Sequence, residues 1–234
     1  MNKLFIVASK EMNGIIRTRS QMFVGIFFAL WFSVMTAPVV KTVEESLLFD
    51  QFNNLLFYFV LMLGIFMAYL FSGKIFFTEK REGIIETLLC TPLSIRQIWA
   101  GKVLGVTIPA YLVALLAAAS ITLIANVFST TVLLPSPAVF LHIFLVVPAF
   151  IAAAVGLLGF GHFLLGLREN QILNIAVFAV IFFALSLARN VIGVGSAVSG
   201  VLVGAMLIVA VLLLALISYL ARYLNKERIV TTIA

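Results

Sequence analysis

The chain has 234 residues, of which 64% are hydrophobic and only 10% charged, and its mean hydropathy is +1.23. Ordinary soluble domains are roughly 45–50% apolar and about 25% charged. A globule of this size cannot withdraw so many apolar residues from water, which excludes a soluble enzyme, a disordered chain and a disulfide scaffold. The 15 basic and 9 acidic residues give a net charge of +6. In a membrane chain the placement of these charges matters more than their sum, and we expect no nucleic-acid partner.

The first twenty residues are predicted to form a unit of their own. Lys3, Lys10 and Arg17 are spaced by seven residues and share one helical face. The opposite face is apolar and consists of Leu4, Phe5, Ala8, Met12, Ile15 and Ile16. A basic stripe opposite an apolar stripe is typical of a helix that lies in the membrane interface and is attracted to anionic headgroups. We therefore expect residues 1–20 to be an amphipathic interfacial helix in contact with membrane lipid.

Six apolar stretches follow, each near the length of about 20 residues that a helix needs to cross a bilayer. Their apolar residues run on without the period-two alternation of barrel strands. The sequence thus predicts an all-α polytopic membrane protein, a single transmembrane domain over residues 1–234. The expected spans are Gln21–Val40, Asn54–Phe77, Gly101–Phe128, Val139–Leu167, Gln171–Ala188 and Ser199–Tyr223.

The basic residues indicate one orientation. With the N-terminus inside, thirteen of the fifteen Lys and Arg residues lie in cytoplasmic segments, and only Lys41 and Arg189 lie outside. An excess of Lys and Arg in cytoplasmic segments is the rule for helical membrane proteins. We expect a multi-pass protein of the plasma or inner membrane with both termini in the cytoplasm.

The connection between the second and third spans, residues 78–98, has the most distinctive pattern. Gly83–Leu89 is amphipathic and only about two turns long, and Thr91-Pro92 ends it because the residue before proline avoids the helical region. Ser94 and Gln97 form a capping box, which predicts that a new helix starts there and continues into the third span. The short helix has exposed apolar residues and no core of its own, so we expect a cytosolic partner.

This segment resembles the signature of type-2 ABC transporter permeases, the membrane subunits of type V ABC exporters. The resemblance rests on Glu79-Lys80-Arg81-Glu82-Gly83, Glu86-Thr87-Leu88-Leu89, Thr91-Pro92-Leu93-Ser94, Ile98 and Gly101-Lys102. It implies a coupling helix that docks on a separate ABC ATPase, which would carry ATP and Mg, and pairing with a second permease copy, identical or not. This chain itself would need no cofactor. The ATPase-docking residues would be Glu79, Arg81, Glu82, Gly83, Glu86, Leu88, Leu89, Pro92 and Arg96.

One feature departs from that family's pattern. Its members often have two re-entrant half-helices between the last two spans, but Arg189–Val198 leaves little room for them. Among polar residues inside the spans, His162 and Asn174 are candidates for function. For His162, hydrogen bonding between helices is favoured over proton transfer. The carboxylates of Glu44, Glu45 and Asp50 lack His or Cys neighbours, so no metal site is expected.

The chain lacks a Walker motif, because Gly73-Lys74 and Gly101-Lys102 lack the upstream glycine spacing and the following hydroxyl residue. It also contains no Gly-x-Ser-x-Gly, His-Glu-x-x-His or Cys-x-x-Cys. We therefore expect a non-enzymatic transporter subunit, part of an exporter, with ATP hydrolysis on another chain. Two alternatives stay open: a haem-exporter-type permease of cytochrome c biogenesis, and a membrane assembly protein without transport activity.

Overall fold

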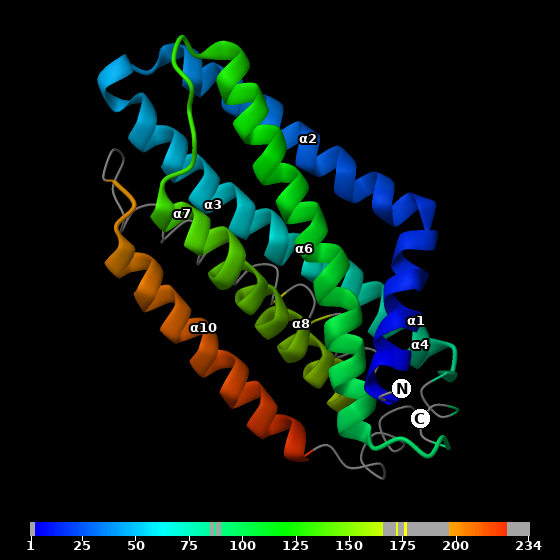
Figure 1. The fold of residues 1–234 in the computed structure, drawn as a ribbon. Coiled ribbons are helices and arrows are strands. Elements are labelled where there is room, and N and C mark those ends of the chain that lie inside the picture. The colour runs from blue at the N-terminus through cyan, green and yellow to red at the C-terminus, as the bar shows by residue number, and fades with distance from the viewer. Residues whose placement is uncertain are drawn as a thin grey trace.

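A computed structural model describes residues 3–84, 87, 90–165, 172, 176 and 197–223. Within these residues every regular element is a helix (Figure 1). In chain order they are α1 (Lys3–Arg17), α2 (Arg19–Thr42), α3 (Glu45–Ser72), the π-turn η1 (Gly73–Phe77), α4 (Thr78–Arg81), α6 (Ile95–Phe128), α7 (Pro137–Leu141), the π-turn η2 (His142–Val146), α8 (Val147–Leu164), α10 (Gly200–Leu220) and the 3₁₀ turn η3 (Ala221–Tyr223).

Five of the described helical stretches are long and apolar enough to cross a membrane, which supports a helical membrane protein. They are Arg19–Thr42, Ser46–Arg81, Ile95–Phe128, Pro137–Leu164 and Gly200–Tyr223. They coincide with the predicted first, second, third, fourth and sixth spans. The predicted fifth span, Gln171–Ala188, lies outside the described residues apart from two isolated positions.

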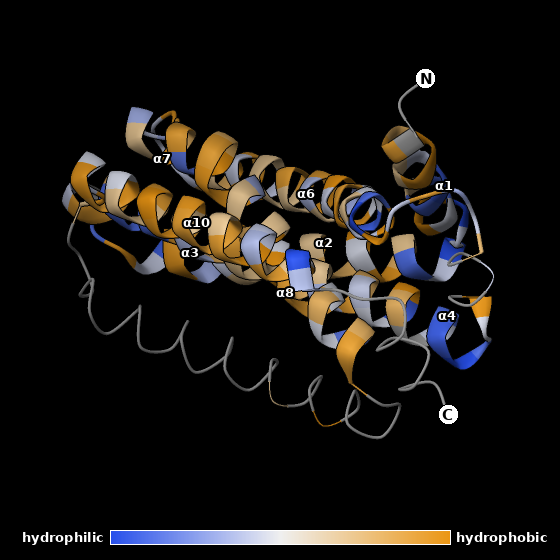
Figure 2. Cartoon of the chain, turned by 90° about the horizontal axis from the view of Figure 1, so that it is seen from below, coloured by the Kyte–Doolittle hydropathy of each residue, from blue (hydrophilic) through white to orange (hydrophobic). Residues whose placement is uncertain are grey.

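The long helices run side by side, and their ends define two ends of the bundle (Figure 1). We name the end that holds α1, α4, the start of α6 and the ends of α8 and α10 the basal end, and the opposite one the distal end. Of the Lys and Arg residues that the structure describes, Lys41 alone lies at the distal end. Figure 2 shows hydrophilic residues on α4 and mostly hydrophobic ones along α10.

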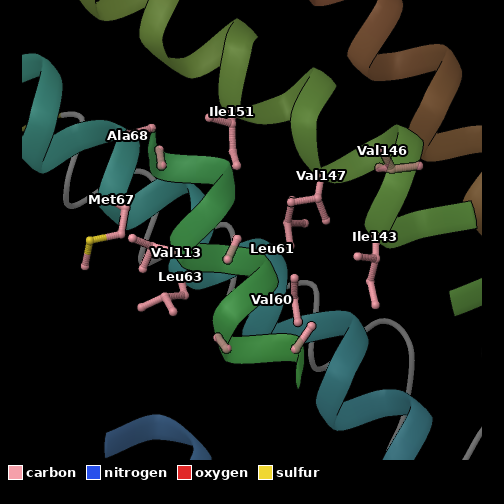
Figure 3. Close-up of a cluster of buried hydrophobic side chains, with 14 of the residues drawn as sticks. Val60, Leu61, Leu63, Met67, Ala68, Val113, Ile143, Val146, Val147 and Ile151 are labelled. Atoms are coloured by element: carbon pink, nitrogen blue, oxygen red, sulfur yellow. The ribbon is translucent and has the colours of Figure 1, made fainter. Parts of the chain in front are cut away.

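The packing of α3 against α8 forms the centre of the core. Phe57 stacks on His142 with ring centroids 4.1 Å apart, and Phe76 stacks on His162 at 6.0 Å. Between these pairs, a Cβ placed on Gly64 would lie 2.7 Å from Cδ1 of Ile151. Residue numbers rise together along both helices, so α3 and α8 pack in parallel. Figure 3 shows apolar side chains of α3, α6, η2 and α8 interleaved in this region.

Proline is accommodated differently in two of the long helices. Helix α6 continues through Pro109 without interruption, whereas Pro148 follows directly on η2. A proline ring clashes with the carbonyl four residues earlier, which here belongs to Phe144 inside the wider π-turn. We infer that η2 gives Pro148 the space that a regular α-turn would deny it.

Candidate functional site

Helix α1 lies directly against the backbone of α6 at the basal end. A Cβ on Gly101 would come within 2.7 Å of Cβ of Val7, and one on Gly105 within 2.7 Å of the Ala8 carbonyl oxygen. Two glycines four residues apart form a flat helix face that another helix can approach closely. Val7, Ala8 and Ile15 are buried by this contact or beside it.

Only part of the predicted apolar face of α1, which we expected to meet membrane lipid, packs on the protein. Phe5 remains 62% exposed and Ile16 45% exposed, whereas Glu11 is buried beside Val7, Ala8 and Ile15. The predicted helix is therefore confirmed, but its packed face is rotated so that one flank of apolar residues stays open. Lys10 and Arg17 lie on the exposed side; their role at a membrane interface remains a prediction.

Four charged residues meet where α1, α4 and α6 converge. Lys102 of α6 is fully buried; its Nζ donates to Glu11 Oε1 at 2.8 Å and also to Glu79 Oε2. Lys10 Nζ pairs with Glu79 Oε1 at 3.2 Å and with Glu11 Oε1 at 3.3 Å. We call Lys10, Glu11, Glu79 and Lys102 the ion-pair cluster. Its two lysines balance its two carboxylates, as buried charges require.

The two lysines of the cluster occupy different environments. Lys102 also lies over the Phe76 ring, 5.7 Å from its centroid, while the Lys10 side chain is 55% exposed. Partial burial lowers the pKa of Lys10, but attraction to Glu79 and Glu11 outweighs that desolvation and leaves the pKa above its usual value. Lys10 thus lies at the exposed edge of the ion-pair cluster, and Lys102 lies at its buried centre.

Lys80, next to Glu79 on α4, reaches the end of α8. Its Nζ donates to the carbonyl oxygens of His162, at 3.4 Å, and Leu165. The last carbonyls of a helix have no partner within the helix and attract cations. Adjacent residues of α4 therefore hold it to α1 and α6 on one side and to the last turn of α8 on the other.

The predicted docking residues divide into buried and exposed groups. Glu79 is buried in the ion-pair cluster, while Arg81, Glu82, Pro92 and Arg96 are exposed. Gly83 has a φ of +69°, a left-handed conformation that suits glycine and ends α4. The other three predicted docking residues, Glu86, Leu88 and Leu89, lie outside the described residues.

The predicted start of the third span is confirmed. Ser94 Oγ accepts from the Gln97 backbone N–H at 3.3 Å, and Gln97 Oε1 accepts from the Ser94 N–H at 3.1 Å. This capping box starts α6 at Ile95, two turns before Lys102. The box thus fixes the start of the helix that carries Lys102 into the ion-pair cluster.

Of the two intramembrane polar candidates, the structure describes His162, which is not a member of that cluster. His162 is buried in α8 against Phe76, and Asn174 lies outside the described residues. Among the residues that the structure describes, no group of three His, Cys, Asp or Glu side chains could hold a metal ion. The candidate site is therefore a charged junction of helices.

Sequence reasoning missed Glu11, Lys80 and Lys102 as partners in this junction. A signal for two of them was available. Glu11 shares the spacing of Val7, Ala8 and Ile15 on one helical face, and Lys102 lies between Gly101 and Gly105 in a long apolar helix. An acid on a packing face and a lysine between closely packing glycines each require a buried partner of opposite charge.

No protein-family model and no curated protein matches this chain, so the comparisons assign it to no family.

Proposed function

We propose that the chain is the membrane-spanning permease subunit of an ATP-driven ABC exporter of the type-2 class, located in the cell membrane. A separate cytoplasmic ATPase would dock on residues 78–98 and supply ATP and Mg chemistry. The observation that carries the proposal is the way this segment is attached: its first turn, α4, is held by Glu79 and Lys80 to three other helices, while Arg81 and Glu82 next to them are exposed.

The physical reason lies in what a coupling element has to do. Nucleotide-driven motion of an ATPase reaches the membrane only through an element that is open to the partner and firmly joined to the spans. Exposed charges beside α4 are suited to orient a docking partner, because charges at the rim of an interface determine specificity more than affinity. The resemblance of residues 78–102 to the coupling segment of that family supports the same assignment.

Topology forms part of the proposal. We infer six spans, with the basal end and both termini in the cytoplasm. The described basic residues concentrate at the basal end, as the positive-inside rule requires. Helix α8 ends at the basal end and α10 begins at the distal end, and a fifth span over Gln171–Ala188 would account for this (Figure 1). Reporters fused after Lys41 and after Arg228 should lie on opposite sides of the membrane. Finding both reporters on the same side would refute the six-span topology.

The active unit would contain two permease copies and two ATPase subunits. A single six-span chain presents mostly apolar side chains, so a second copy is needed to enclose a path for substrate. The mass of the purified complex measures this stoichiometry directly. One permease per two ATPases would contradict it.

Docking can be tested with one substitution and a matched control. Leu88→Asp places a charge on the apolar side of the proposed coupling helix, whereas Leu134→Asp places the same charge on an exposed distal connection. Both variants should insert in the membrane. We expect Leu88→Asp to lose co-purification of a Walker-motif ATPase encoded beside this chain, and Leu134→Asp to keep it. Glu86→Lys should act like Leu88→Asp. Retention of the ATPase and of full transport by both coupling variants would refute the docking assignment.

A further inference from the structure

We infer that Lys102 is a positioning residue that, through Glu11 and Glu79, makes α1 and the first turn of the docking segment move as one body. This inference rests on the proposed function and adds a role for α1. In this role α1 is a lever: it is joined to the segment on which the ATPase acts and moves with that segment, as well as lying at the membrane surface.

The geometry supports a mechanical link because one atom serves both helices. Nζ of Lys102 donates to Glu11 on α1 and to Glu79 on α4, so separating α1 from α4 would break the Lys102–Glu11 and Lys10–Glu79 ion pairs together. Breaking one side of a buried ion pair is strongly unfavourable, which favours joint motion over separation. Lys10 closes the arrangement from the exposed side by pairing with the same two acids.

Apolar packing alone would not fix α1 in this way. At a membrane boundary, lipid chains compete with apolar side chains for contact, so an apolar helix face has little preference for protein over lipid. The glycine face of α6 brings the backbone of α1 close, and its contacts there are with Val7, Ala8 and the Cβ of Glu11. Charges in defined positions supply the missing orientation, the best-attested use of buried polar groups.

The test measures the separation of α1 from the docking segment in the full-length chain in lipid vesicles. The sequence contains one cysteine, so Cys90→Ser gives a background free of thiols. Spin labels at Ser9→Cys on α1 and Glu82→Cys directly after α4 lie at exposed positions. The distribution of distances between the two labels reports whether the helices remain joined.

Four backgrounds separate positioning from simple loss of structure. Lys102→Met removes the central charge. Lys102→Arg keeps a cation, whose guanidinium group can donate to both carboxylates. The triple variant Glu11→Gln, Glu79→Gln, Lys102→Met removes the buried charges together and keeps the fold free of unpaired ions. Lys74→Met, on exposed η1, is the control for loss of a lysine.

We expect a narrow distance distribution in the parent, in Lys74→Met and in Lys102→Arg. In Lys102→Met the distribution should broaden, with the detached population rising roughly 100-fold, because two buried carboxylates lose their central cation. In the triple variant the distribution should also broaden, because the directed contacts between α1, α4 and α6 are lost, although no buried charge is left unpaired. Helical content of the triple variant should stay at the parent value. An unchanged narrow distribution in Lys102→Met and in the triple variant would overturn the inference.

The ATPase arm separates this inference from the proposed function. If the parent chain stimulates ATP hydrolysis by its ATPase, and the triple variant binds the ATPase but does not stimulate it, the proposed function and this inference are both supported. If the parent neither binds nor stimulates an ATPase, the proposed function fails, while the label distances still decide whether Lys102 joins the two helices. Full stimulation in the triple variant would refute the lever.

Discussion

Glycines bring the helices close together at both the α1–α6 and the α3–α8 interface, but different interactions hold the two interfaces together. Gly101 and Gly105 let α1 reach the backbone of α6, and Gly64 and Gly159 let α3 and α8 pack with side chains in direct contact. Around Gly64 the contacts are apolar over several turns (Figure 3). Around Gly105 they lead into buried ion pairs.

The difference shows what each interface requires. Two long spans are aligned by the membrane itself, so α3 and α8 need only close packing to stay in register. A 15-residue helix outside the spans has no such alignment, and its orientation must be specified by directed interactions. The following predictions separate these two requirements, from the largest expected effect to the smallest.

Gly105→Leu should displace α1 from α6. Its Cβ would meet the Ala8 carbonyl oxygen and Glu11 Cβ, both at 2.7 Å, and the Ala8 backbone cannot move aside alone. We expect a loss of about 3 kcal/mol or more in stability. Thermal unfolding in detergent, followed by size-exclusion fluorescence, measures this. Gly204→Leu is the control, since a Cβ there meets nothing within 4 Å; equal stability of the two variants would contradict the close approach.

Lys80→Met should loosen the contact between α4 and the end of α8. It removes a charged donor from the carbonyls of His162 and Leu165, each a hydrogen bond to a cation. The expected loss is about 2 kcal/mol. Arg81→Met, at the exposed neighbouring position, should cost far less in the same unfolding measurement. Similar losses in both variants would show that Lys80 does not cap α8.

Gly159→Ala should have a moderate effect at the apolar interface. Its Cβ would lie 2.7 Å from Cζ of Phe76, the far end of a side chain that can rotate. We expect a loss of about 1 kcal/mol, partly offset by the better helix propensity of alanine. Gly14→Ala in α1, with open space around the Cβ, should instead be neutral or stabilising. The loss of stability should therefore be largest for Gly105→Leu, smaller for Gly159→Ala and absent for Gly14→Ala, and thermal unfolding tests this order.

The smallest effect concerns Lys10 and pH. The Lys10 pKa is raised in the folded chain, so its contribution is fully present below the unfolded value near pH 10.4 and is lost as the pH rises through the folded value. Because the side chain is half exposed, we expect only about 0.5 kcal/mol. The difference in thermal midpoint between the parent and Lys10→Met should therefore be constant around neutral pH and vanish in strong alkali. A difference that grows with alkali would contradict the pairing.

The sequence predicts the helical architecture well because its signals are local. The start of α6 follows from Ser94 and Gln97, and the end of α2 from polar residues after Val40, both confirmed within a few residues. The five described spans follow from apolar length alone. Such features depend on neighbours in the chain, which a single sequence displays in full.

The junction could not be predicted in the same way because it joins distant residues. Glu11 and Lys102 are 91 positions apart, and no local pattern specifies that they meet. The apolar face of α1 likewise gives no sign that Glu11 is buried while Phe5 and Ile16 stay exposed, because hydrophobicity alone cannot show which residues of a helix meet protein. Which acid pairs with which lysine is decided by the tertiary structure, and a single sequence does not display that.

The π-turn η1 has a consequence for how the length of this chain can vary. A π-turn contains about one residue more per turn than an α-turn, so η1 absorbs an extra residue between α3 and α4 without turning Glu79 away from Lys102. Removing one residue from Gly73–Phe77 should therefore restore a regular α-helix and leave both flanking helices in phase. A deletion of one codon, usually destructive inside a spanning helix, should be tolerated here and keep the acid and the lysine in register.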